Sequence, residues 1–425
     1  MNKLFFSLTL VIVIMISSVF GLLFTQPGNN IIASYIEDTV NDKREDINFK
    51  VENLTLSFDT LNFSANFADK SKIDIKGDLK ILEKVVDLKY VVDIKELSNL
   101  QNLTKQRLNG PFYTSGTFKG NDKEAIVQGL SNVASSDTSY MINMVNFEPS
   151  SIKLDVKEAK VDELLYLVNQ PIMTTGKLNI NANIKNADPK NLAGTIVSTV
   201  LDGEVSNKYL NNTLQKKINT PITYKTRTNA VLKDGKVLAN SSVVSSLATL
   251  VSKKTMIDLN SSVVESKYNL TIPNLSKLEE FIGMKLNGEF STLGDIKVQN
   301  KVVDITGTTP LFKSFTKYKA KLKNSKVEYI NVDVKNARVK QLLATLNQPS
   351  YAKGNLNINA DIQNADINNL KGTITSRITD GLVTNKVVNK QFNQKLKDKI
   401  SFALNTTTNL QGTQAITKAI LDSNR

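Results

Sequence analysis

The side chains that most often carry enzyme chemistry are missing from this sequence or scattered along it. The chain of 425 residues has no histidine and no cysteine, so it lacks the commonest general base at neutral pH and the ligands that zinc and copper prefer. A metal would have to be held by oxygen atoms alone. Two carboxylates could still catalyse glycoside hydrolysis, but the spacing of the acids selects no such pair.

The acids that stand out have structural interpretations. Asp202-Gly203 and Asp380-Gly381 are dipeptides typical of tight type I′ hairpins, because both positions tolerate positive φ. Other acids lie on the wet side of predicted strands, and no glycine-rich phosphate loop, nucleophile elbow or metal-binding helix occurs. We expect no catalytic residue, no metal and no cofactor, and keep a periplasmic hydrolase as the weakest alternative.

An internal duplication organises the chain. The segment from Ile152 to Val205 returns without a gap as Ile330 to Val383, and 30 of these 54 aligned positions carry the same residue. Each pair has the same offset, as in Gly194 and Gly372, where 372 − 194 = 178. The predicted domains are a membrane anchor (1–27), a membrane-proximal β region (28–84), repeat copy 1 (85–247) and repeat copy 2 (263–425).

Alternating apolar and polar residues predict β-strands with one apolar face. The alternation begins near Phe49, continues through Leu88 and Tyr90, and is most regular from Lys177 to Lys185 and in its copy. Such strands are typical of antiparallel sheets with one wet face. The fold class is therefore mainly β with short amphipathic helices, in two tandem duplicated units.

Helices are predicted between the strands from apolar rows, caps and breakers. We expect them at Ile31 to Val40 after a break at Pro27-Gly28, after capping boxes at Ser98 and Ser276, at 161–168 and 339–346, and along the row Leu210, Leu214 and Ile218.

The N-terminus carries an uncharged apolar run from Leu4 to Phe24, long enough to span a bilayer as a helix. We interpret it as an uncleaved anchor, with a cleaved signal peptide as the alternative. Acids outnumber bases after the run, so the bulk of the chain is expected outside the cytoplasm. The absence of cysteine excludes disulfide bonds.

The net charge is +14, and the lysines are scattered. A solvated, lysine-rich surface is one interpretation, and attraction to anionic lipid head groups is the other. Nucleic acid is not an expected partner, because no basic patch is interleaved with aromatic residues.

The pattern resembles the AsmA-like family of bacterial envelope proteins, relatives of TamB and of the bridge-like lipid-transfer proteins. The resemblance lies in the anchor, the break at Thr25, Pro27 and Gly28, the one-face-apolar strands, and the Leu-x-Gly and Asp-Gly-x-Val blocks at 192–205 and 370–383. It implies a strongly curved antiparallel sheet whose apolar face lines a groove, held in the periplasm from the inner membrane. It also implies phospholipid transport or outer-membrane assembly as the function.

The candidate lipid-binding residues are apolar or aromatic positions of the predicted groove, and the turn candidates are glycines and aspartates. The groove set is Leu88, Tyr90, Leu178, Ile180, Ile184, Tyr268, Leu356, Ile358 and Ile362; the turn set is Gly194, Asp202, Gly203, Gly372, Asp380 and Gly381. Ordinary core packing under the protein's own helices is the alternative for each groove residue. At the level of function, the alternative to lipid conduction is a non-enzymatic scaffold that contacts outer-membrane or envelope assembly proteins.

Overall fold

The computed structural model describes residues 23–68, 70–324, 326–366 and 369–424. The chain divides into two compact units, Met1–Ser206 and Asn207–Arg425. The repeat of 178 residues crosses this division, since copy 1 begins in unit 1 and ends in unit 2.

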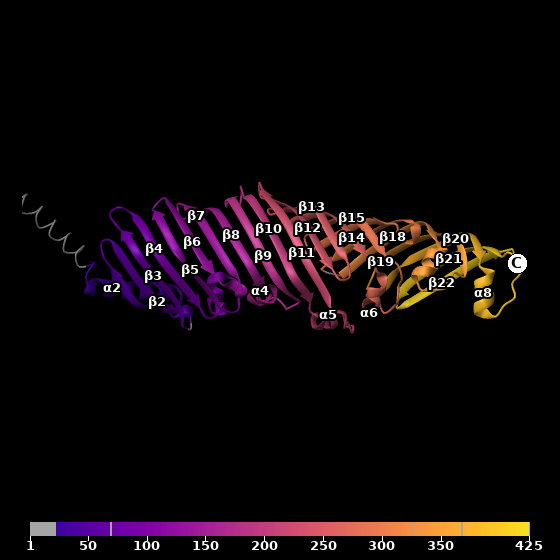
Figure 1. Cartoon of the computed structure of the whole chain (residues 1–425), viewed down its shortest axis with the longest axis horizontal. Coiled ribbons are helices and arrows are strands. Elements are labelled where there is room, and N and C mark those ends of the chain that lie inside the picture. The colour runs from indigo at the N-terminus through magenta and orange to yellow at the C-terminus, as the bar shows by residue number, and fades with distance from the viewer. Residues whose placement is uncertain (1–22, 69, 325, 367–368, 425) are drawn as a thin grey trace, which may run out of the picture. The chain divides into compact units, whose positions relative to one another are not determined.

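Unit 1 is an open antiparallel meander in which each strand pairs with the next along the chain (Figure 1). Its strands are β1 (Lys50–Leu56), β2 (Thr60–Phe67), β3 (Ser71–Lys80), β4 (Val85–Ile94), β5 (Phe112–Asn121), β6 (Glu124–Ser131), β7 (Asp137–Val145), β8 (Glu148–Lys160), β9 (Thr174–Asn186) and β10 (Ala193–Val205). Among the described residues no pairing joins β1 to β10, so this sheet does not close.

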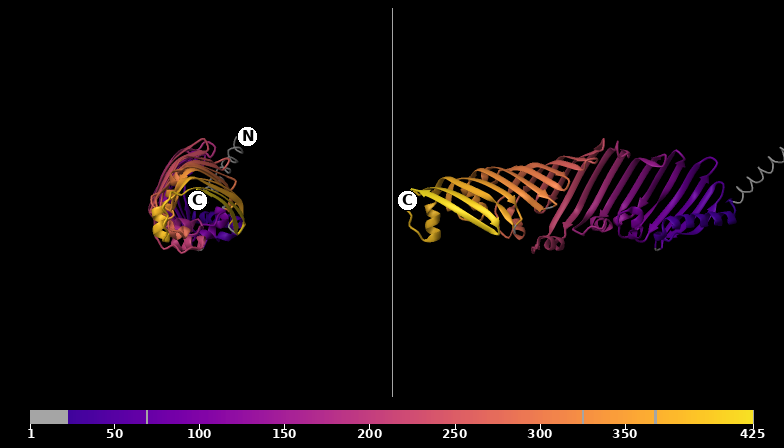
Figure 2. Two further views of the ribbon diagram at one scale, coloured as in Figure 1. Left: turned by 90° about the vertical axis from the view of Figure 1, so that its right-hand side faces the viewer. Right: turned by 180° about the vertical axis from the view of Figure 1, so that it is seen from behind.

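Unit 2 has the same meander. Its strands are β11 (Ile222–Lys233), β12 (Lys236–Ser245), β13 (Thr249–Asp258), β14 (Val263–Ile272), β15 (Phe290–Gln299), β16 (Val302–Thr309), β17 (Phe315–Lys323), β18 (Lys326–Arg338), β19 (Ala352–Asn364), β20 (Leu370–Val383), β21 (Ser401–Gly412) and β22 (Gln414–Ser423). Seen end-on, the strands nearest the C-terminus bend into an arch (Figure 2). The mainly β, antiparallel fold class predicted from the alternation is confirmed.

The duplication is present in the structure element by element. Strands β4 to β12 return as β14 to β22 at the same offset, as in 263 − 85 = 178 for the first residues of β4 and β14. The predicted strand containing Lys177 to Lys185 is β9, and Gly194 and Gly372 lie close to the first residues of β10 and β20. The repeat is therefore a structural unit as well as a sequence pattern.

The helices are short and lie along one margin of each sheet where Figure 1 labels them. They are α2 (Gln26–Lys43), α3 (Gln101–Thr104), α4 (Val161–Leu167), α5 (Asn207–Leu214), α6 (Glu279–Ile282), α7 (Val339–Thr345) and α8 (Asn385–Phe392). The 3-10 turns Leu97–Leu100 and Leu275–Leu278 precede α3 and α6.

Three helix predictions differ from the structure. The capping boxes at Ser98 and Ser276 are wrong, because Glu96 and Asn274 accept hydrogen bonds from the Ser98 and Ser276 amides instead. The row ending at Ile218 is too long: α5 ends at Leu214, and Ile218 lies in the following loop. There the Asn211 amide side chain both accepts from the Ile218 N–H at 2.7 Å and donates to its carbonyl at 3.1 Å.

The Asp-Gly dipeptides are also not hairpin turns. Asp202 and Asp380 lie inside β10 and β20 with φ of 50° and 53°, and the strand register shifts between Leu201 and Glu204. Each dipeptide therefore forms a β-bulge, because the tolerance for positive φ that suits a turn also suits an extra residue in a strand. Gly381 has a further role, since a Cβ there would lie 2.4 Å from the Phe402 carbonyl oxygen.

Helix α2 covers the free edge of β1. Pro27 lies in its first turn, where a missing N–H costs nothing, so the predicted break is wrong and the helix extends beyond Ile31 to Val40 on both sides. Asn41 exchanges two hydrogen bonds with the Phe49 backbone, at 2.8 and 2.7 Å. Asn29 bonds the Leu56 backbone in the same way, and Glu37 accepts from the Val51 N–H. These side chains replace a neighbouring strand.

The segment from Leu4 to Phe24 falls mainly on residues 1–22, outside the described residues. Among the helices that the structure describes, none is long and apolar enough to cross a membrane.

We predict that Asn41→Ala lowers the free energy of unfolding by about 1 to 3 kcal/mol, because it leaves the Phe49 N–H and C=O at the sheet edge without their partners. Urea unfolding of the full chain measures the change, and hydrogen exchange measures faster exchange in β1. Asn30→Ala, at an exposed position of the same helix, is the control and should change neither. Equal behaviour of the two variants would contradict the edge-covering role of α2.

Candidate functional site

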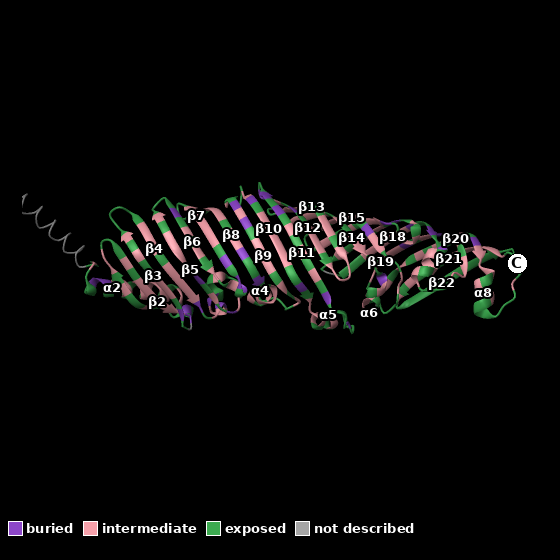
Figure 3. Cartoon of the chain, viewed as in Figure 1, coloured by how far each residue is buried: buried purple, intermediate pink, exposed green. Residues whose placement is uncertain are grey.

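One face of each sheet carries aligned apolar rows. In unit 1, cross-strand pairing places six apolar side chains side by side from β4 to β9: Leu88, Phe118, Val127, Ile142, Ile152 and Ile184. In unit 2, the row on the same face contains Ile296, Ile305, Ala320, Ile330 and Ile362. Most of these side chains are half-buried. The face is apolar, yet the described residues do not fully cover it (Figure 3).

A hollow lies on this face in unit 2. Its volume is about 760 Å³, and its lining includes Leu270, Ile296, Ile305, Leu311 and Val332. Tyr268 and Tyr318 lie in the same lining. Ligand pockets commonly have volumes of about 300 to 1,000 Å³ and mostly apolar linings. The hollow therefore has the size and character of a site for an apolar ligand.

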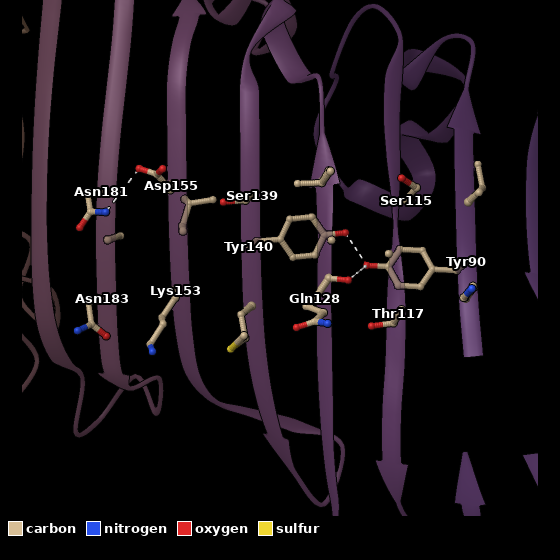
Figure 4. Close-up of a pocket in the computed structure, with 18 of the residues that line it drawn as sticks. Tyr90, Ser115, Thr117, Gln128, Ser139, Tyr140, Lys153, Asp155, Asn181 and Asn183 are labelled. Carbon is tan, nitrogen blue, oxygen red and sulfur yellow. Dashed lines mark hydrogen bonds between the residues drawn. The ribbon is translucent and has the colours of Figure 1, made fainter. Parts of the chain in front are cut away.

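A pair of tyrosines braces the apolar face of unit 1. The Tyr90 and Tyr140 hydroxyls are 2.6 Å apart and point toward one another (Figure 4). The Thr114 hydroxyl lies 2.5 Å from the Tyr140 hydroxyl and donates to the Leu130 carbonyl at 2.9 Å. The hydroxyls satisfy one another, so the polar ends of the rings are bonded within the protein. The carbon atoms of the rings therefore form part of the apolar face.

Glycine makes room for these rings. Gly116 and Gly129 lie opposite one another on β5 and β6, between the two tyrosines in the cross-strand row. A Cβ on Gly116 would be 2.7 Å from the Tyr90 hydroxyl oxygen, and a Cβ on Gly129 would be 2.7 Å from that of Tyr140. Each ring thus covers backbone where its neighbouring strand has no side chain, a known way to stabilise glycine in strands.

The same arrangement occurs in unit 2 at an offset of 178. The Tyr268 and Tyr318 hydroxyls are 2.5 Å apart, and the Thr292 hydroxyl is 2.7 Å from that of Tyr318. Gly294 and Gly307 take the places of the first glycine pair. Burial, and then the bond to the second tyrosine, raises the pKa of Tyr90 and of Tyr268. These phenols therefore stay neutral at any physiological pH.

The groove candidates fall into three groups. Leu178 and Ile180 pack with a buried cluster that includes Val156 and Leu164 of α4. Their copies Leu356 and Ile358 pack with the cluster under α7. Leu88, Ile184 and Ile362 lie in the apolar rows, where Ile184 is buried and the other two are half-buried. Tyr90 and Tyr268 belong to the braces. The helices thus pack against one end of the apolar face and do not cover its middle.

The opposite face of unit 1 holds a second hollow of about 910 Å³. Its lining mixes polar and apolar residues. The polar ones include Ser115, Gln128, Ser139, Lys153, Asp155 and Asn181, which are labelled in Figure 4, and the apolar ones include Val91, Leu130 and Met141. The acid of this lining, Asp155, forms an ion pair of 3.4 Å with Lys157, and both side chains are exposed. No group of three or more potential metal ligands occurs among the described residues.

Comparison with known proteins gives no relative: no family model matches the chain, and no curated protein or solved structure matches it significantly.

Sequence reasoning named Tyr90 and Tyr268 but missed their partners. The missing residues are Thr114, Gly129, Tyr140 and the copies Thr292, Gly307 and Tyr318. Their signal was present, since all three types recur at 178, but the repeat alone does not say that a tyrosine on β4 reaches one on β7. That follows only from the cross-strand register.

We predict that Gly129→Ala destabilises the chain by about 1 to 3 kcal/mol, because the added methyl group collides with both tyrosine hydroxyls and with the Ser115 carbonyl oxygen. Gln128→Ala changes the adjacent exposed residue on the opposite face and should stay within about 0.5 kcal/mol of the parent. Urea unfolding of the full chain measures both. An unaltered stability of Gly129→Ala would show that the rings do not pack on the glycine backbone.

Proposed function

We propose that this protein binds phospholipid acyl chains along the apolar face of its sheets and conducts or holds them for the bacterial envelope. One observation carries the proposal: the apolar rows are half-buried, and the helices cover only one end of them. A sheet with an apolar face needs an apolar partner. Acyl chains provide one without requiring a specific sequence.

The chemistry of the face supports a hydrocarbon ligand. The hollow in unit 2 is lined by Leu270, Ile296, Ile305 and Val332, and the hydroxyls of its tyrosines are bonded to each other. Each methylene moved from water onto such a surface contributes roughly 0.8 kcal/mol. A chain of a dozen or more methylenes therefore gains substantial free energy without any polar contact.

The repetition supports a ligand that extends along the sheet. The tyrosine brace occurs in both units with the same residues in the same register, and an apolar row lies beside it in each unit. A small, single-site ligand gives no reason to build the same surface twice. The net charge of +14 is compatible with attraction of anionic head groups to the polar surfaces.

The proposal also includes a cellular location and a function without catalysis. The run from Leu4 to Phe24 would hold the chain in the inner membrane with its N-terminus in the cytoplasm and its bulk in the periplasm. The protein would act without catalysis. These features agree with the resemblance to the AsmA-like family.

The proposal is tested by photocrosslinking in cells at two neighbouring positions of β15. Ile296 lies on the apolar face and Lys297 on the polar face, so a photoreactive phenylalanine analogue at each position samples one face of the same strand. We predict phospholipid adducts, detected by mass spectrometry, at position 296 and few or none at 297. The same pair can be repeated in unit 1 with Phe118 and Lys119.

The alternative outcomes are informative. Protein adducts at 296 would favour the scaffold function, in which an assembly protein occupies the apolar face. Equal lipid labelling at 296 and 297 would mean general membrane contact and would contradict a groove. No adduct at either position in a folded chain would remove the support for lipid binding.

A further inference from the structure

One buried hydroxyl in the hollow of unit 2 has no partner. Thr309, the last residue of β16, is only 6% exposed and belongs to the lining of this hollow. Its hydroxyl oxygen is buried and forms no hydrogen bond with any residue that the structure describes. Burying a hydroxyl without a hydrogen bond is costly. The hollow therefore contains a polar group that is available to a ligand.

The neighbouring threonines differ from Thr309 in this respect. Thr292 and Thr316 are also buried, and both line the same hollow. The Thr292 hydroxyl lies 2.7 Å from that of Tyr318, and the Thr316 hydroxyl lies 2.7 Å from that of Ser314. Of these three threonines, Thr309 alone has a hydroxyl without a partner among the described residues.

The first copy of the repeat satisfies the equivalent hydroxyl within the protein. Ser131 is the counterpart of Thr309, since 309 − 131 = 178. Its hydroxyl donates a hydrogen bond to the Tyr113 carbonyl oxygen at 2.7 Å. The two copies therefore differ at this position, because only the second one leaves the hydroxyl for another acceptor.

Apolar surface continues from Thr309 along its own strand. Residues two apart in a strand lie on the same face, so Gly307 and Ile305 follow Thr309 on the face that carries the tyrosine brace. Ile305 lies about 13 Å from Thr309, at roughly 3.3 Å per residue. It pairs with Ile296 on β15, and both isoleucines line the hollow. The hollow thus combines a hydrogen-bond donor with a neighbouring stretch of hydrocarbon.

We infer, on the basis of the proposed lipid binding, that the Thr309 hydroxyl donates a hydrogen bond to an ester carbonyl oxygen of the bound phospholipid. The ester carbonyl is the polar group that adjoins an acyl chain, so it is the acceptor nearest to Thr309 when the chain lies along Ile305 and Ile296. An ester has no donor of its own, and the contact satisfies both buried groups at once. The hollow of unit 2 thereby fixes the position of one lipid along the face, whereas unit 1 contacts hydrocarbon without this preference.

Two lipids that differ only in the ester carbonyls test this contact. Diester and diether phosphatidylglycerol with the same hydrocarbon tails are mixed in equal amounts with the full chain in mild detergent, and a photoreactive phenylalanine analogue at position 296 captures the lipid in the hollow. Mass spectrometry distinguishes the two adducts. We expect the diester adduct to exceed the diether adduct by roughly two- to tenfold, the preference that one neutral hydrogen bond gives. The same analogue at position 118 in unit 1 is the matched control and should capture both lipids equally.

Variants of Thr309 separate hydrogen bonding from shape. Thr309→Val has a similar shape without the hydroxyl, so it should resist urea at least as well as the parent and capture the two lipids equally at position 296. Thr309→Ser keeps the hydroxyl and should keep the preference for the diester.

The possible failures are distinguishable. Equal capture of both lipids by the parent at position 296 would overturn the ester contact and leave acyl-chain binding intact. A diester preference that persists in Thr309→Val, or that also occurs at position 118, would overturn it in the same way. A folded chain that captures neither lipid would overturn the ester contact together with the proposed function.

Discussion

A sheet that is apolar on one face and wet on the other must place the apolar face against something, and most of this molecule follows from how it meets that constraint. Its strands alternate, so that apolar side chains line up in rows on one face of each unit. Its helices are too short to form a second layer, and α4 and α7 pack only against one end of the strands. The middle of the face remains half-buried.

The tyrosine braces show how such an open face stays ordered without a covering layer. Two rings on separate strands lie over a pair of glycines and bond through their hydroxyls, and a threonine ties the bond to a backbone carbonyl. This arrangement stabilises the sheet from within its own face. Because the hydroxyls are consumed by each other, it does so without leaving a polar group in the path of a hydrocarbon ligand.

At the strand edges and in the loops, side chains likewise satisfy hydrogen-bonding groups within the protein. Asparagine side chains mimic a neighbouring backbone: Asn41 bonds Phe49, Asn211 bonds Ile218, and Asn389 bonds Leu396 in the second copy. Each uses one carboxamide to satisfy both an N–H and a C=O. The abundance of asparagine in the sequence therefore has a structural explanation at these positions.

The sequence predicts the strands well because their signal is local. Alternation in Lys177 to Lys185 fixes which residues share a face, and the offset of 178 carries that result to the second copy. It predicts local backbone geometry less well: Asp202 tolerates positive φ in a bulge as readily as in a turn, and Pro27 begins a helix as readily as it breaks one. Only part of the site could be predicted from the sequence, because the contact between Tyr90 and Tyr140 depends on the register of four strands.

If acyl chains cover the apolar face, the purified protein should carry bound phospholipid that mass spectrometry can quantify. The full chain would be purified, its detergent exchanged for amphipathic polymer, and its phospholipid content compared with that of a variant carrying Ile296→Asp and Ile305→Asp. We expect at least one phospholipid per parent chain beyond the annular lipid, and a loss of that lipid in a variant that keeps its β-sheet content. Equal lipid content in both folded proteins would contradict it.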